Sequence, residues 1–420
     1  MKLIICLLEG ISEVLLEDYI SCNLLPNFKK LCNSGAYGKL VCNPIPYEAS
    51  GIVTAFSGTE VYDHGIISYW KPVNKDYLPE QWNSGDIKEY MFWNKEPFKN
   101  LRYCIVNLFG TQPAYDINGY LISYSMEKNL KFTYPKNLII ELNKQKFPYV
   151  QDTAVFFREN TDKNLFYKDI LEVDRLRKNA FFELMKKDID VAIVNFTQID
   201  RLSHFYFAQK DTVDRKDSIL FKAYKRSDEY LGELMERAEK MQSELLVFSE
   251  IGFGALKKFV SINNYLRKNN LLQQKEDQTV LYDNSLAFES VQGTHGININ
   301  QKGRYRNGII SDKEYKSTLK QIIEVVKQMP NPYTDKPMFK NVFPGKIYSI
   351  GNNVPDILVE PYDWEYLPYG DPYWANHVSR HSQTGWHRNT SFWGYYGNHT
   401  QNNGQKSLVD LYKIMEQTLL

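Results

Sequence analysis

The sequence lacks a long apolar run and a clear excess of charge of either sign. Of its 420 residues, 51 are Lys or Arg and 50 are Asp or Glu, which gives a formal net charge of +1. This balance offers no basic surface for a nucleic-acid polymer, so we expect none as a partner. No stretch reaches the roughly 18 apolar residues that a membrane-spanning helix needs, and we expect no membrane association.

Cysteine is scarce, and no secretory signal is visible. The 5 cysteines lie in the first quarter of the chain and form no CxxC pair, so free thiols in a reducing compartment are the simplest interpretation. The apolar run at residues 3–8 is too short for a signal peptide and is followed at once by Glu9. We interpret it as a buried strand and expect a cytoplasmic protein.

Aromatic residues, in contrast, are abundant. They make up 14% of the chain, with 30 tyrosines, which favours a well-packed globular protein with a ring-lined cleft. The aromatic run at 362–396 suits a small-molecule substrate that carries an aromatic or extended apolar group. Core packing explains many of these rings equally well, and the sequence leaves the oligomeric state open.

Short apolar runs alternate with helical stretches along the chain. Strands are expected at 3–8, 103–108, 191–196 and 245–249, and helices at 27–34, 174–187, 223–240, 312–328 and 408–420. Runs without polar alternation are typical of strands that are buried on both faces. The pattern predicts an α/β fold with a mainly parallel central sheet and helices on both faces.

The same reading predicts a division into domains. Residues 1–254 and 351–420 are expected to form one metal-binding core. A segment at about 70–170, rich in Tyr, Lys and Asn, is interpreted as a cap-like insertion that partly covers the sheet. Residues 255–350 are interpreted as a small α/β lobe inserted into the core.

Acidic residues follow three of the expected strands. These are Glu9, Asp200 and Glu250. Ligands bind beyond the carboxyl ends of parallel strands, so the three carboxylates are expected at one edge of the sheet. A single acid there is usually a helix cap or a loop residue, whereas three together indicate a metal site.

Histidines add to this pattern. Asp200 and His204 are four residues apart, so on a helical turn they share a face and can share a metal ion, although this spacing alone is a weak signal. Four of the seven histidines lie at 377–399 within an aromatic stretch. They fit either a solvated surface lobe or the rim of a metal site.

A series of short motifs in a fixed order resembles the type I phosphodiesterase/nucleotide pyrophosphatase branch of the alkaline phosphatase superfamily. The motifs are LLEG at 7–10, LPNF at 25–28, GAYG at 35–38, TAFSG at 54–58, HGI at 64–66, NG at 118–119, DRLSH at 200–204, SEIGFG at 249–254, NQKGR at 300–304, PDI at 355–357 and TGWHR at 384–388. Each motif is modest, but their order over most of the chain is specific. The resemblance implies an alkaline phosphatase-like fold and metal-dependent phosphoester hydrolysis.

The resemblance also implies two metal ions, commonly zinc. One ion is bound by the Asp and His of DxxxH and by a late His, and these positions hold Asp200, His204 and His387. His295 is a rival for the late position, but the NQKGR motif after it places it at the start of the inserted lobe. His64 is interpreted as closing a turn.

The positions for the other ion depart from the family pattern. An Asp, a Ser or Thr nucleophile and an Asp-His pair are replaced by Glu9, Glu48, Glu250 and Ile251. Glu48 is placed by counting back from Gly58, so Ser50 remains a rival for the nucleophile. A glutamate cannot readily replace a metal-activated hydroxyl that attacks phosphorus.

Three functions are compatible with this altered site. The first is a divergent hydrolase of phosphoester or phosphodiester type, in which a metal-activated water replaces the nucleophile and Glu48 acts as general base. The second is a repurposed dinuclear metalloenzyme with oxidase or oxygenase chemistry. The third is a non-catalytic binding module. The family resemblance alone puts the hydrolase first.

The number and identity of the metal ions differ between these functions. Glu9, Glu48 and Glu250 are hard oxygen donors and could bind a second ion. Two histidines and four carboxylates together suit iron or manganese better than zinc. We therefore expect one or two divalent ions, zinc, manganese or iron.

Overall fold

The computed structural model describes residues 1–71, 74–124, 131–151, 163–277, 279–291, 293–347, 354–368, 370, 383–398 and 401–420. Contacts divide the chain into two compact units. The first unit comprises Met1–Thr59, Asn83–Gly254 and Gln383–Leu420, and the second comprises Glu60–Trp82 and Ala255–Ser382. Residues 255–350, predicted as an inserted lobe, lie in the second unit together with Glu60–Trp82 and with residues 351–382, which were expected in the core.

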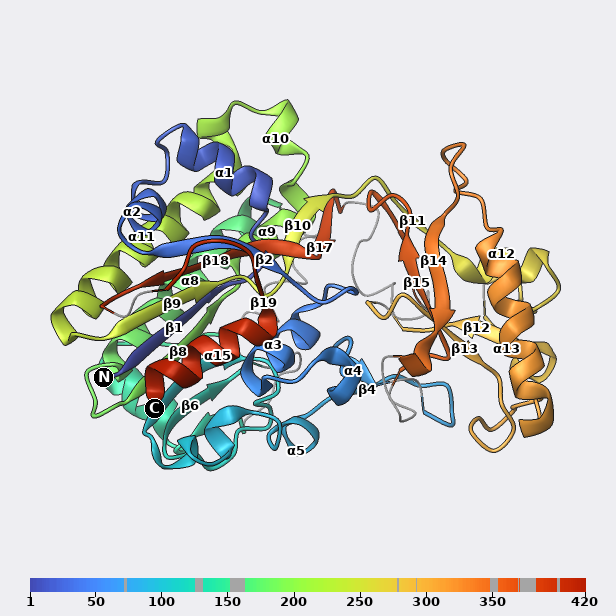
Figure 1. Cartoon of the computed structure of the whole chain (residues 1–420), viewed down its shortest axis with the longest axis horizontal. Helices are drawn as coiled ribbons and strands as arrows, with labels where there is room; N and C mark the ends of the chain where they lie inside the picture. The colour runs from blue at the N-terminus through green and yellow to red at the C-terminus, as the bar shows by residue number, and fades with distance from the viewer. Residues whose placement is uncertain are drawn as a thin grey trace. The chain divides into compact units, whose positions relative to one another are not determined.

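The first unit is built on a nine-stranded sheet in the order β19-β2-β18-β9-β1-β8-β5-β6-β7 (Figure 1). The strands are β1 Leu3–Leu8, β2 Ala36–Val41, β5 Tyr103–Leu108, β6 Gly119–Ser123, β7 Thr133–Tyr134, β8 Val191–Phe196, β9 Glu244–Phe248, β18 Thr390–Tyr396 and β19 Lys406–Ser407. The five strands from β9 to β6 are parallel, and β18 and β7 pair antiparallel with their neighbours.

Helices lie on both sides of this sheet (Figure 1). They are α1 Glu13–Ser21, α2 Pro26–Ser34, α3 Glu48–Ser57, α5 Ser84–Ile87, α6 Leu138–Lys144, α8 Lys163–Leu184, α9 Gln198–Tyr206, α10 Gln209–Thr212, α11 Ile219–Met241 and α15 Leu408–Leu419, with short 3-10 helices η1 Phe92–Asn94, η2 Phe98–Asn100 and η3 Arg215–Asp217. The prediction of an α/β fold with a mainly parallel sheet is confirmed.

Burial on both faces explains the composition of the central strands. Every residue of β1, β5 and β8 is buried. Strands covered by helices on both sides have no face for polar side chains, so their sequences are continuous apolar runs rather than alternating ones. The polar groups that matter therefore follow the strands, at their carboxyl ends.

The segment interpreted as a cap contributes strands to the sheet. β5 pairs in parallel with β8 and with β6, and β6 pairs with β7. The strand β6 has only five residues and begins with Gly119 and Tyr120, so its apolar pattern in the sequence is weak. Residues 125–130 and 152–162 of this segment lie outside the described residues.

The second unit has its own antiparallel sheet and core. Four strands pair in the order β12-β13-β15-β14, and Ile297, Ile322 and Ile357 lie in the apolar cluster beneath them. Its elements are α4 Val61–His64, β3 Trp70–Lys71, β4 Glu80–Gln81, β11 Lys258–Val260, α12 Ile262–Lys268, η4 Tyr282–Asn284, β12 Ala287–Glu289, β13 Gly296–Ile299, α13 Asp312–Lys327, β14 Phe339–Pro344, η5 Gly345–Ile347, β15 Ile357–Pro361 and β16 Tyr366–Pro368. A further two-stranded sheet, which belongs to the first unit except for Ala255, pairs β10 Gly252–Ala255 with β17 Gly385–Arg388.

The described residues can be compared with the expectations about membrane-spanning helices and free cysteines. None of the described helices is both long enough and apolar enough to cross a lipid bilayer. The five cysteines are free thiols, and three of them, Cys6, Cys42 and Cys104, are buried. The cytoplasmic location stays a prediction.

The C-terminal helix α15 supports α3, on which all ten residues are buried. A capping box begins α15: Ser407 Oγ accepts a hydrogen bond from the Asp410 amide at 3.3 Å, and the Asp410 carboxylate accepts one from the Ser407 amide at 2.9 Å. We expect Ser407→Ala to lower the free energy of unfolding by about 1 kcal/mol in urea titrations, because the first turn loses its side-chain acceptor.

A serine that caps no helix N-terminus provides the control. Ser21 is exposed at the last residue of α1. Ser21→Ala is expected to change the free energy of unfolding by less than about 0.5 kcal/mol. Equal losses in the two variants would show that the capping box does not stabilise α15.

Candidate metal centre at the carboxyl ends of the strands

Three buried carboxylates lie at one edge of the central sheet. Glu9 directly follows β1, Asp200 lies in the first turn of α9 after β8, and Glu250 follows β9. The strand β1 is flanked by β8 and β9, and all three are parallel, so their carboxyl ends point the same way. Each of the three side chains is 1% exposed or less.

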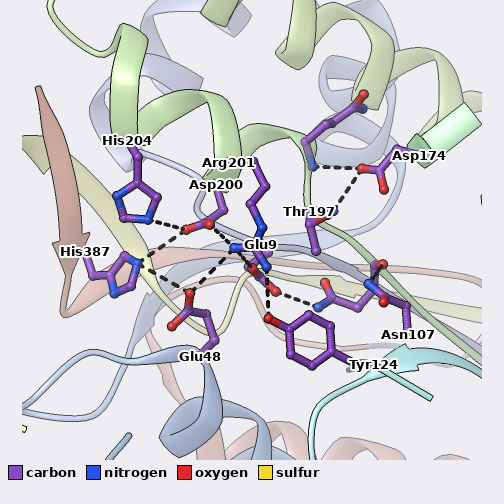
Figure 2. Close-up of polar contacts among 12 residues, drawn as sticks. Glu9, Glu48, Asn107, Tyr124, Asp174, Thr197, Asp200, Arg201, His204 and His387 are labelled. Carbon is purple, nitrogen blue, oxygen red and sulfur yellow. Dashed lines mark hydrogen bonds and ion pairs between the residues drawn. The ribbon is translucent and has the colours of Figure 1, made fainter. Parts of the chain in front are cut away.

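Two histidines meet Asp200 at this edge, as Figure 2 shows. The Nε2 atom of His204 lies 3.6 Å from Asp200 Oδ1, and the Nε2 atom of His387, on β17, lies 3.4 Å from the same oxygen. Glu48 begins α3, and its Oε1 atom lies 3.5 Å from His387 Nε2. All four side chains are buried.

Close backbone approaches bring these elements together. Gly10 has a φ of +84°, and a Cβ atom at this position would lie 2.7 Å from the Cα atom of Asp200. A glycine is therefore needed for the turn after β1 to lie against α9. On the other side, the Thr384 amide donates to the His204 carbonyl at 2.7 Å, which holds the start of β17 beside α9.

The spacing of the ligand atoms fits a single metal ion. Four ligands at about 2.0–2.2 Å from a tetrahedral ion lie roughly 3.3–3.6 Å from one another. The distances of 3.4 and 3.6 Å from Asp200 Oδ1 to His387 and His204 match this spacing and exceed a normal hydrogen bond. Among the described residues, Asp200 Oδ1 and His387 Nε2 are buried without a hydrogen bond. These three side chains therefore fit a divalent cation.

The surroundings shift the pKa values of the two imidazoles, His204 and His387, in opposite directions. Burial lowers the pKa of His204 to about 3, so this ring is neutral and its lone pair is available to a metal ion. Burial also opposes the charged form of His387, but the carboxylates of Glu48 and Asp200 outweigh it and raise its pKa. Burial would raise the pKa of Asp200, but the neighbouring side chains of His204, His387 and Arg201 hold its pKa well below the ordinary value.

A buried arginine lies among the carboxylates and was not singled out from the sequence. The Nη1 atom of Arg201 lies 2.6 Å from Asp200 Oδ2 and 3.2 Å from Glu9 Oε1. Its Nη2 atom donates to the Tyr124 hydroxyl at 3.2 Å. Arg201 stands within the DRLSH motif, but consecutive residues of a helix do not normally face each other, so the pattern gave no reason to pair it with Asp200.

The carboxyl groups of Glu9, Glu48 and Glu250 all have raised pKa values, because burial removes them from water. Ligand atoms of Glu9, Glu48 and Asp200 lie within 4.8 Å of one another, and this group does not include Glu250. Both carboxylate oxygens of Glu250 are buried with no hydrogen-bond partner in the described part of the chain. A second ion at Glu9, Glu48 and Glu250 stays a prediction.

The other residues considered from the sequence lie elsewhere. His295 belongs to the second unit and is in neither group of candidate ligands found among the described residues. His64 Nδ1 accepts a hydrogen bond from the Ile66 amide at 3.0 Å, as expected for a turn-closing residue. Ser50 Oγ accepts one from Asn43. His377, His381 and His399 lie outside the described residues.

With this geometry in hand, comparison with solved structures identifies the fold, which is alkaline phosphatase-like. Phosphonoacetate hydrolase from Sinorhizobium meliloti 1021, solved in complex with phosphonoformate, has a TM-score of 0.63 at 10% identity, covering 100% of this chain and 95% of that one. Murine ectonucleotide pyrophosphatase/phosphodiesterase 5 has a TM-score of 0.58 at 13% identity, with the same coverage.

The family follows from the sequence itself. The family model for type I phosphodiesterase/nucleotide pyrophosphatase matches residues 3–388, so the chain belongs to this family. An inactive variant of the murine protein, in complex with AMP, also matches with a TM-score of 0.58 at 13% identity over 100% of this chain and 95% of that one. At such identities the likeness shows the fold alone. No curated protein sequence matches the chain.

The unpartnered carboxyl group of Glu250 gives a prediction for the metal-free protein. Folding raises its pKa, so the native state binds this proton more tightly than the unfolded state and loses stability as the pH rises above the ordinary carboxyl value. We expect Glu250→Gln to remove this loss. In thermal unfolding after treatment with a chelator, the variant should exceed the wild type at about pH 8, and the gain should shrink toward about pH 4.

The exposed Glu17 on α1 offers a matched control for this experiment. Glu17→Gln makes the same substitution on an exposed side chain, so any change that it shares with Glu250→Gln comes from the substitution itself and not from the buried position. If Glu250→Gln has the same pH profile as the wild type, the carboxyl group of Glu250 does not carry the predicted electrostatic cost.

Proposed function

We propose that the chain is a metal-dependent phosphoester hydrolase, of phosphodiester type, that uses water instead of a side-chain nucleophile. In this proposal Asp200, His204 and His387 hold a divalent ion, and Glu48 is the general base. The observation that carries it is the 3.4–3.6 Å spacing of these ligand atoms, with Glu48 Oε1 3.5 Å from His387 Nε2. When bound, the ion would polarise a phosphoryl oxygen and lower the pKa of water.

The position of Glu48 supports its role as the base. Its Oε1 atom faces His387, whereas its Oε2 atom is buried with no hydrogen bond from any described residue. That second oxygen is available to accept a proton from an attacking water. Burial raises the pKa of Glu48, which brings it closer to neutral pH and makes the carboxylate a stronger base.

The direction of Ser50 argues against a serine nucleophile. Ser50 lies two residues after Glu48 on α3, which places it about 200° around the helix from Glu48. Its hydroxyl accepts a hydrogen bond from Asn43. A hydroxyl on the side of α3 away from Glu48 is poorly placed to attack a phosphoryl group held beside His387.

Aromatic rings fix the two imidazoles. The ring centroids of Trp386 and Phe253 lie 4.8 and 5.0 Å from the ring centroid of His204. The ring centroid of Tyr47 lies 5.4 Å from that of His387. Such edge contacts limit ring rotation and keep the nitrogen atoms aimed at one point. The substrate is proposed to be a small phosphodiester or a phosphonate. The first class is suggested by the phosphodiesterase family, and the second by the phosphonoformate in the similar phosphonoacetate hydrolase structure.

A dinuclear centre is the second candidate. It is favoured by the group of Glu9, Glu48 and Asp200, whose ligand atoms lie within 4.8 Å of one another. With iron or manganese in both places, such a centre would suit oxidative chemistry. The charge of Arg201 within this group bears directly on this candidate.

The first test of the hydrolase removes a ligand. His387→Ala should bind less than about a tenth of the metal that the wild type binds, and hydrolysis of bis(p-nitrophenyl) phosphate should fall by about 100-fold or more. Elemental analysis and a chromogenic assay measure the two effects. His295→Ala, the rival histidine, is the control and should retain both properties. Loss of metal from His295→Ala with retention in His387→Ala would reverse the assignment.

The second test separates the base from a nucleophile. Glu48→Gln keeps the shape of the side chain but cannot accept the proton, so kcat should fall about 100- to 10,000-fold while the metal content stays unchanged. Ser50→Ala should keep most of the activity. An active Glu48→Gln variant together with an inactive Ser50→Ala variant would assign the chemistry to Ser50.

A further inference from the structure

We propose that the guanidinium group of Arg201 is a built-in cation that takes the place of a second metal ion, so that the centre holds one ion. This inference concerns the group of Glu9, Glu48 and Asp200. It rests on the proposed function only in taking the first ion to lie at Asp200, His204 and His387. The contacts of Arg201 with the three carboxylates carry it.

The guanidinium lies where a second ion would have to lie. Its Nη1 atom is 2.6 Å from Asp200 Oδ2, 3.2 Å from Glu9 Oε1 and 4.0 Å from Glu48 Oε1 (Figure 2). A hard divalent ion bound by Asp200 Oδ2 and Glu9 Oε1 would lie within about 2.0–2.6 Å of these two oxygens. The ion and Nη1 would therefore compete for one space.

The two carboxylate oxygens of Asp200 face different partners, the proposed metal site on one side and the guanidinium of Arg201 on the other. Oδ1 faces the Nε2 atoms of His204 and His387, and Oδ2 faces the guanidinium of Arg201. A carboxylate that bridges two metal ions divides its oxygens in the same manner. Here one of the two partners is part of the chain.

Glu9 is satisfied without a metal ion. Its Oε1 atom contacts Arg201 at 3.2 Å, and its Oε2 atom accepts a hydrogen bond from Asn195 Nδ2 at 2.6 Å. An ion at this place would have to displace at least one of these partners. The Nη2 atom of Arg201 donates to the hydroxyl of Tyr124, so both terminal nitrogens of the guanidinium have hydrogen-bond partners.

An arginine excludes the second ion at any physiological pH. The guanidinium has five N–H donors and no lone pair to offer, so it can only repel a metal ion and cannot serve as a ligand to one. Like charges that share one set of oxygens repel each other. The guanidinium also offers no exchangeable ligand position, so neither water nor substrate can bind as it would to a second ion.

The test counts metal ions. The wild type, Arg201→Met and Arg201→Lys are stripped with a chelator, loaded with Zn²⁺ or Mn²⁺, dialysed and analysed for metal. We expect one equivalent in the wild type and one in Arg201→Lys, which keeps a cation. Arg201→Met, of similar length but neutral, should bind two equivalents. Two equivalents in the wild type, or one in an Arg201→Met protein with native circular dichroism, would overturn the inference.

A second measurement needs no variant and covers the case in which Arg201→Met fails to fold. The wild type loaded with excess Mn²⁺ should give the electron paramagnetic resonance spectrum of isolated ions. A spectrum of exchange-coupled pairs would overturn the inference. Failure of the proposed function has a different result, because a wild type that binds one ion and does not hydrolyse phosphodiesters contradicts the hydrolase and leaves the role of Arg201 standing.

Discussion

Several carboxylates are buried together at one edge of the central sheet, and the groups around them must compensate for their negative charge. Glu9, Glu48, Asp200 and Glu250 are all 3% exposed or less. Removing a carboxylate from water is costly unless a cation, a proton or hydrogen bonds compensate for the lost hydration. The fold creates this problem itself, because parallel strands that are buried on both faces place their following residues at one water-poor edge.

The compensation takes a different form for each group. Asp200 stays charged between two imidazoles and a guanidinium, and Glu9 is matched by Arg201 and Asn195. Glu48 and Glu250 have oxygens without partners and raised pKa values. The centre thus combines one cation fixed to the chain with one place that suits a cation from solution. The proposed hydrolysis would require only the second, since the proposed base Glu48 and the proposed ligands lie around it.

The sequence predicted the parts of the fold that depend on local pattern. The strands expected at 3–8, 103–108 and 191–196 agree with β1, β5 and β8 to the residue, since a run buried on both faces has an unmistakable composition. β6 was missed because a five-residue strand that begins with Gly119 and ends with Ser123 has no such signal. The motifs name Asp200, His204 and His387. Their side chains come together only because the start of β17 is hydrogen-bonded to α9, which no local pattern predicts. Arg201 could not be found, since the helical pattern turns neighbours of Asp200 away from it.

The guanidinium among the carboxylates also has a consequence for how the protein depends on its surroundings. A centre with two exchangeable ions passes through half-filled forms when metal is scarce, and these forms can differ in chemistry. A chain that carries one of the two positive groups as a covalent part of α9 has only an empty and a filled state. With one exchangeable ion, as proposed, its response to the metal supply would be a simple saturation curve, set by a single affinity.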